Sequence, residues 1–168
     1  LAAGDGHQLN GGAGGSVSIS AGIASGTSAG ADGGEVSLHG GDAAGGTAGR
    51  IALTAGGSSK STGGDLQFSS GSSASTTSGA VRLETMNAAA NGVSGSIAVE
   101  TGTSSRGNSG GIYLATGEAT SGRGGGVELV VGNGSHNDGG DFTLVAGAST
   151  ADATSGGSVS ITAGEGSS

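Results

Sequence analysis

Apolar residues alternate with small or polar residues in short segments that recur along the whole chain. The segments Gly15–Gly22, Gly49–Gly56, Gly95–Gly102 and Gly157–Gly164 each read glycine, any residue, apolar, any residue, apolar, any residue, small, glycine. Alternation with a period of two is typical of an extended strand with one apolar face. The pattern therefore predicts a series of short strands, each with two apolar side chains on the same side.

The apolar positions form two columns with a regular spacing. Successive first positions are separated by a nearly constant step of roughly 15 residues, and repetition at a fixed period is the signature of a repeat architecture. The two columns are therefore predicted to form the structural core. The first column contains Val17, Val36, Ile51, Leu66, Val81, Ile97, Ile112, Val127, Phe142 and Val159, and the second contains Ile19, Leu38, Leu53, Phe68, Leu83, Val99, Leu114, Leu129, Leu144 and Ile161.

The length of the repeat selects the fold class. A repeat of this length is too short for a βαβ unit, but it suits one coil of a flattened solenoid with two short strands and two tight corners. The sequence therefore predicts an all-β protein, a β-solenoid (flattened β-helix) of about ten to eleven coils with parallel sheets and no helices. One sheet would carry the apolar columns, and the spacers rich in serine, alanine and threonine would form a thin opposite face. Glycines are expected at corners with positive φ or where two backbones approach closely.

The two ends of the sequence bear on its domain organisation. Residues 1–168 are expected to form a single domain. Leu1–Gly4 resembles the second half of a repeated segment, and the sequence stops soon after Gly164. Because both ends fall within a coil, we expect a segment of a longer repeat protein. An open sheet edge can pair with another chain, so the expected partners are further copies, joined end to end or along sheet edges, or flanking repeats of the same polypeptide.

Composition supports a thin, ordered repeat. Glycine supplies 42 of the 168 residues, and proline, cysteine and tryptophan are absent. Low complexity of this kind would ordinarily indicate disorder. The fixed apolar spacing and the missing proline argue against disorder, because a proline-free backbone can donate hydrogen bonds along its whole length. Without cysteine there are no disulfides and no zinc–thiolate sites.

Charge excludes one class of partner. The formal net charge is −8, from thirteen acidic and five basic residues, and the chain offers no basic stripe to phosphates, so nucleic acid is not an expected partner. No apolar run approaches the length of a membrane span.

Few residues suggest chemistry. Glu84 and Glu100 are expected in the same outward column of adjacent coils, where Ca²⁺ would relieve their repulsion. The alternative, which we favour, is two solvated glutamates helped by Arg82. His7, His39 and His136 show no metal-ligand spacing. We expect no catalytic residues, no cofactor and no enzyme activity. Asn133 begins the sequon Asn-Gly-Ser and is a candidate N-glycosylation site.

The pattern Gly-Gly-x-Val-x-Leu-x-Ala-Gly with serine, threonine and glycine spacers resembles the glycine- and serine-rich tandem repeats of large extracellular structural or adhesive proteins of algal or marine microbial type. This resemblance implies an extracellular or cell-surface protein. The predicted function is a non-catalytic structural rod, fibre or surface-display and adhesive element. The alternative is a solenoid that binds ice (an antifreeze) or carbohydrate, which would require one ordered flat face.

Overall fold

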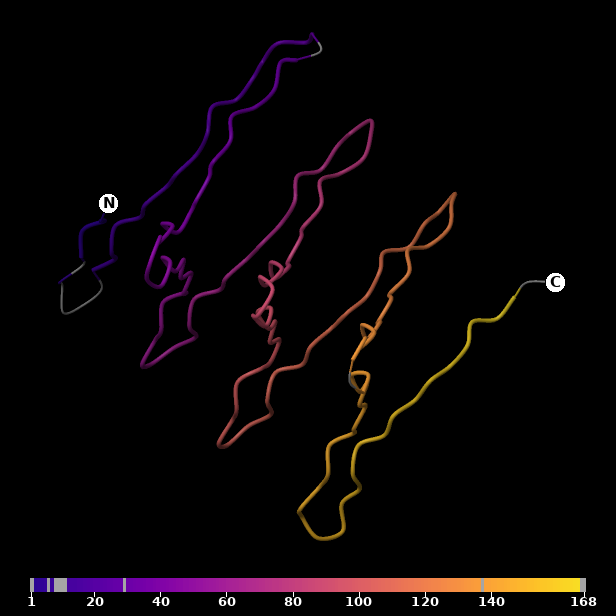
Figure 1. Ribbon diagram of the computed structural model, residues 1–168. Coiled ribbons are helices and arrows are strands. Elements are labelled where there is room, and N and C mark those ends of the chain that lie inside the picture. The colour runs from indigo at the N-terminus through magenta and orange to yellow at the C-terminus, as the bar shows by residue number, and fades with distance from the viewer. Residues whose placement is uncertain (1, 6, 8–11, 29, 137, 167–168) are drawn as a thin grey trace. The chain divides into compact units, whose positions relative to one another are not determined.

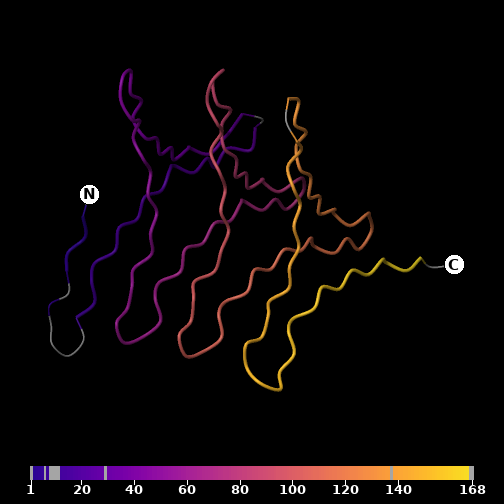
Figure 2. The same cartoon turned by 60° about the horizontal axis from the view of Figure 1, so that its bottom comes forward.

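The computed structural model describes residues 2–5, 7, 12–28, 30–136 and 138–166. Within these ranges the chain forms neither helices nor strands and is extended between tight bends. At each bend the chain reverses direction, so that the segments on its two sides run back past each other (Figures 1 and 2). The structure is therefore a series of open loops joined by extended segments.

The bends recur at the spacing of the sequence repeat. In the described ranges they lie at residues 28 and 30, 44–46, 59–61, 74–76, 90–91, 105–107, 120–122, 135–136 and 151–153. Every one of them falls in a spacer rich in serine, alanine, threonine or glycine, which are residues that tolerate turns. The period seen in the apolar columns is thus also a period of chain reversal.

Backbone hydrogen bonds close several of the loops at their base. The amide of Gly49 donates to the carbonyl of Gly41 over 2.8 Å, and Gly64 donates in the same way to Gly56 over 2.8 Å. Equivalent bonds with N···O distances of 2.8 to 2.9 Å join Gly15 to Gly4, Gly34 to Gly22, Gly79 to Gly71 and Gly157 to Gly147. In each case the glycine that ends one apolar segment is bonded to the glycine that begins the next.

The predicted β-solenoid with parallel sheets is wrong, because no strand is present in the described ranges. The prediction required each spacer to act as a second strand and each coil to pair with the next along its length. Instead, the spacer folds into a loop closed by a single backbone bond at its base. Alternation determines which side chains share a face of an extended segment, but it does not supply a hydrogen-bonding partner for that segment.

The chain divides into two units, Leu1–Glu84 and Thr85–Ser168. The first unit contains the glycine-to-glycine loop bases from Gly4 to Gly79. In the second unit, Gly157 and Gly147 form such a base, while Thr101 and Thr116 close two other loops through their side chains. Both units therefore use the same loop, but they close it with different groups.

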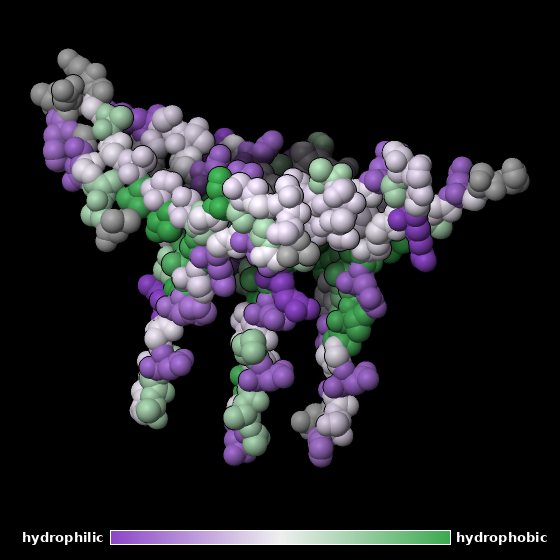
Figure 3. All heavy atoms as spheres, turned by 90° about the horizontal axis from the view of Figure 1, so that it is seen from above, coloured by the Kyte–Doolittle hydropathy of each residue, from purple (hydrophilic) through white to green (hydrophobic). Residues whose placement is uncertain are grey.

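The twenty side chains of the apolar columns, which the sequence predicts as a core, are exposed. Val17 and Val159 have the smallest exposed fractions of the set, 49%, and Ile161 has the largest, 88%. No residue in the described part of the chain is buried. The space-filling view shows green, apolar side chains at the surface (Figure 3). The least exposed residues include Ala3, Ala21, Ala55 and Ala146, which directly precede the closing glycines of loop bases.

Glycines are needed mainly where two backbones approach each other. A Cβ added to Gly49 would lie 2.7 Å from the amide nitrogen of Gly41, and one added to Gly34 would lie 3.2 Å from the Cβ of Ala21. Of the glycines in the described ranges, Gly30 alone has a positive φ, 95°. Most of the repeated glycines that have no room for a side chain are therefore explained by the close approach of two backbones at a loop base. A positive φ at a corner does not explain them.

Candidate functional site

Serine side chains help to hold several of the loops. The Ser73 hydroxyl accepts hydrogen bonds from the amides of Ser75 and Thr76, with O···N distances of 3.4 and 3.0 Å. The Ser58 hydroxyl accepts from Lys60 and Ser61 in the same way, over 3.4 and 2.9 Å. This is the side-chain-to-backbone turn that serine commonly forms.

The third member of this group is Ser104, whose hydroxyl accepts from the amide of Gly107 over 3.0 Å. In the sequence these serines occupy the second position of the spacer, where every residue is small. Sequence analysis missed their role because it placed the spacers on a thin opposite face of the predicted solenoid. The signal was present, since serine followed by a turn within three residues favours such a bond.

Two threonines close loops in the second unit. The Thr101 hydroxyl donates to the carbonyl of Gly110 over 3.2 Å, and the Thr116 hydroxyl donates to the carbonyl of Gly125 over 3.1 Å. Each threonine stands at the small position just before the closing glycine of its segment. A hydroxyl at this position therefore takes the place of the backbone bond that closes loops elsewhere.

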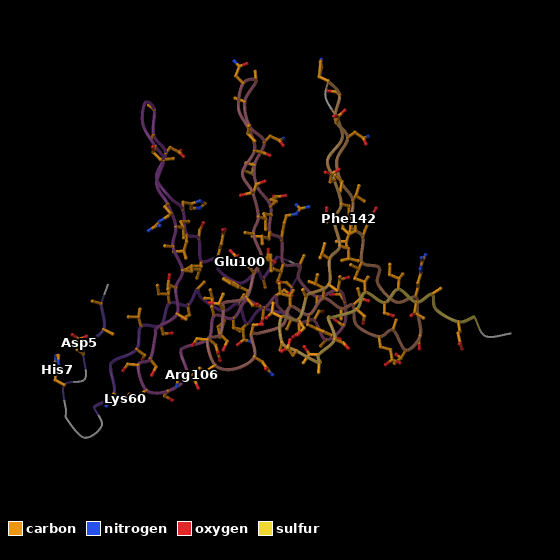
Figure 4. The ribbon with its side chains drawn as sticks, turned by 90° about the horizontal axis from the view of Figure 1, so that it is seen from below. Asp5, His7, Lys60, Glu100, Arg106 and Phe142 are labelled. Carbon is orange, nitrogen blue, oxygen red and sulfur yellow. The ribbon has the colours of Figure 1, made fainter. Side chains whose placement is uncertain are left out.

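Among the described residues, ionisable side chains form two exposed pairs. His7 Nε2 lies 3.9 Å from Asp5 Oδ2, and Arg82 Nε lies 3.7 Å from Glu84 Oε2. All four side chains are at least 60% exposed, so each pair contributes little to stability. Asp5 and His7 are seen together in Figure 4. The Arg82–Glu84 pair gives Glu84 the cationic neighbour that the solvated interpretation of this residue expected.

The calcium candidates Glu84 and Glu100 belong to different units. Within the described ranges, no group of three or more histidine, aspartate or glutamate side chains is arranged to hold a metal ion. Lys60 in the first unit and Arg106 in the second each occupy a bend, at 59–61 and 105–107, so each charge lies at a loop of its own unit (Figure 4).

Two histidines contact serines. His39 is hydrogen bonded to Ser37, and His136 Nδ1 lies 2.9 Å from the Ser135 hydroxyl. A serine nucleophile needs a histidine that is itself oriented by an acid. Among the described hydrogen bonds and ion pairs, neither of these histidines contacts a carboxylate. These pairs are therefore local surface contacts of neighbouring residues.

The glycosylation candidate Asn133 is exposed and precedes the bend that contains Ser135 and His136. Its side chain is thus accessible in a loop, as a sequon requires. The Ser135 hydroxyl, the third residue of the sequon, is the group bonded to His136.

Comparisons with family models, with curated proteins and with solved structures found no match to this chain. The described part of the structure contains no helix that is long and apolar enough to cross a membrane. The features of the chain that bear on its function are therefore its own repeat, its loops and its exposed apolar columns.

Proposed function

We propose that this chain is a non-catalytic structural element of the extracellular space or cell surface, which acts as a fibre component, a spacer or a surface-display segment. The observation that supports this is the repetition of one loop design. Bends and loop bases return at the spacing of the sequence repeat, and a backbone bond between two glycines or a threonine hydroxyl closes the loop at its base.

A repeated structure of this kind distributes its reactive side chains evenly along the chain. An enzyme concentrates a nucleophile, a base and an orienting group in one desolvated place. Here the described acids, bases and histidines are exposed and are spread along the chain, and the pairs that they form, such as Arg82 with Glu84, are local. Repetition serves functions in which length and surface matter, because each added repeat adds the same increment of both.

The experiment that tests this proposal is localisation in the source organism. Antibodies raised against the purified chain are applied to intact and to permeabilised cells and detected by immunogold electron microscopy. We expect label at the surface of intact cells or on extracellular material. Label that appears only after permeabilisation would overturn the proposal. Pre-absorption of the antibody with the purified chain is the control for specific labelling.

A further inference from the structure

The chain exposes far more surface than a compact monomer of its size. Its accessible surface is 16391 Å². A compact monomer of 15.1 kDa would expose about 7,100 Å², and the fully unfolded chain would expose about 22,000 Å². A single copy therefore buries only about a quarter of the surface of the unfolded chain, whereas a domain of about 150 residues usually buries about two thirds.

The exposed surface includes an ordered apolar part. The two columns repeat at the same spacing through both units, and each of their side chains is between 49% and 88% exposed. Exposed apolar area costs roughly 25 cal/mol per Å², so twenty such side chains create a strong tendency to be covered. Scattered exposed apolar residues need no explanation, but a regular array indicates an interaction surface.

Charges are kept off the column positions. Asp65, Arg82, Glu84, Glu100 and Glu128 all occupy the positions that alternate with the apolar residues. In an extended segment, alternate side chains point to opposite sides. The segments therefore have one apolar side without charges and one polar side that carries them, so the apolar side can be covered without burying an ion.

The backbone of the described extended segments also makes few hydrogen bonds. In the described ranges, the backbone–backbone bonds lie at the loop bases and in the turns at Ala31 and Gly92. Apart from the amides that serine hydroxyls hold in the bends, most amides and carbonyls of the described extended segments therefore remain available. An extended segment with free backbone groups is a template for pairing with another extended chain.

We propose that the two apolar columns bind a second copy of this chain. The extended segments of the two copies pair, the apolar columns face each other, and the polar sides remain in solvent. This inference rests on the proposed function, because it names the partner through which a fibre or spacer is assembled. Ordering of the columns is then coupled to association, as in obligate homo-oligomers.

The area and the spacing both favour a second copy as the occupant. The surface in excess of a compact monomer is about 9,000 Å², which exceeds the roughly 1,600 Å² of a standard interface and the roughly 2,000–5,000 Å² of large obligate ones. A partner must also match apolar pairs that return at the spacing of the sequence repeat, and a second copy carries that same spacing. A lipid surface would cover the apolar side chains but would leave the backbone amides and carbonyls unpaired.

The test compares two double variants of the full chain. Leu53→Asp with Val99→Asp places a carboxylate in a column in each unit. Ala52→Asp with Ala98→Asp, the matched control, adds the same charge one residue earlier, on the polar side. Association is measured by sedimentation equilibrium over about two orders of magnitude in concentration, because an assembly dissociates by mass action. Circular dichroism is recorded at the same concentrations.

We expect the unmodified chain to associate, with a circular dichroism signal that changes over the same concentration range. The column variant should weaken association about tenfold or more, since burial of an unpaired carboxylate costs at least about 1.4 kcal/mol. The control should stay within about threefold of the unmodified chain, as expected for surface substitutions. Equal weakening by both variants would overturn the proposed face.

An unmodified chain that stays monomeric throughout, whether compact or unstructured, would overturn binding of a second copy. It would also assign the columns to an intramolecular contact or to a different partner. This outcome is separable from failure of the proposed function, which immunogold labelling tests independently. A monomer at the cell surface contradicts the assembly alone, and an associating chain found only inside cells contradicts the proposed location alone.

Discussion

A glycine at the base of a loop brings two backbones closer than a side chain permits. One example is Gly49, where a Cβ would lie 2.7 Å from the Gly41 nitrogen and 3.3 Å from the Gly41 oxygen. Because those atoms belong to the backbone, they cannot rotate away as a flexible side chain could. At Gly46, in the bend of the same loop, a Cβ would meet nothing within 4 Å. The two glycines of this loop thus differ, because Gly46 has room for a side chain and Gly49 does not.

We predict that Gly49→Ala opens this loop base and that Gly46→Ala does not. The added methyl group forces apart the backbones that the 2.8 Å bond from the Gly49 amide to the Gly41 carbonyl holds together. Loss of one such bond, worth about 1 kcal/mol, should speed amide hydrogen exchange at residue 49 roughly fivefold. Nuclear magnetic resonance measures this rate directly. Equal exchange in the two variants would show that the close approach is not what selects glycine.

At the scale of the element, each loop is a local structure. Gly56 and Gly64 are bonded to each other, and Ser58 holds the bend between them through Lys60 and Ser61. Nothing in this arrangement depends on the next loop. This independence contrasts with an ordinary domain, in which the elements depend on one shared core.

We predict that deletion of one repeat, residues 64–78, leaves the other loops intact. The deletion joins Gly63 to Gly79, so that Gly79 occupies the place of Gly64 opposite Gly56. Chemical shifts of residues 41–49 and 101–125 should stay unchanged, because their closing bonds lie within their own loops. A shift of resonances throughout the chain would instead indicate a shared cooperative structure. Deletion of residues 64–71 alone, which breaks the register, is the comparison.

The sequence predicts the period of this structure better than its pairing. The spacing of the apolar columns reappears in the bends, since small and turn-forming residues occupy every spacer. Pairing between segments could not be predicted, because alternation such as Val81, Leu83 fits any extended chain, whether or not it has a neighbour. For the candidate site, the sequon at Asn133 could be found from the sequence, whereas the serine-held bends were placed on a thin opposite face of the predicted solenoid.

At the scale of the whole molecule, apolar exposure and net charge act in opposite directions. The columns favour association, while a charge of −8 on every copy opposes it. The balance between the two depends on the ionic strength, because salt screens exposed charges and leaves apolar burial largely unaffected.

We predict that salt strengthens self-association. The Debye length falls from about 30 Å at 0.01 M to about 3 Å at 1 M, so repulsion between negatively charged copies is largely removed over this range. Sedimentation equilibrium in sodium chloride should show the dissociation constant falling about tenfold, which corresponds to about 1.4 kcal/mol. An assembly held together by ion pairs would respond in the opposite direction and weaken.

The single backbone bond at each loop base also has a mechanical meaning. Between Gly41 and Gly49 the chain runs through eight peptide units, yet the bonded nitrogen and oxygen are 2.8 Å apart. A pull along the chain acts on that one bond, and its rupture releases about 27 Å of contour length. Loops that open one after another would let the chain lengthen in steps under tension, and each would close again on a local contact when the load is removed. A polypeptide with this design would lengthen under load in small steps, because each step breaks one weak hydrogen bond that can form again.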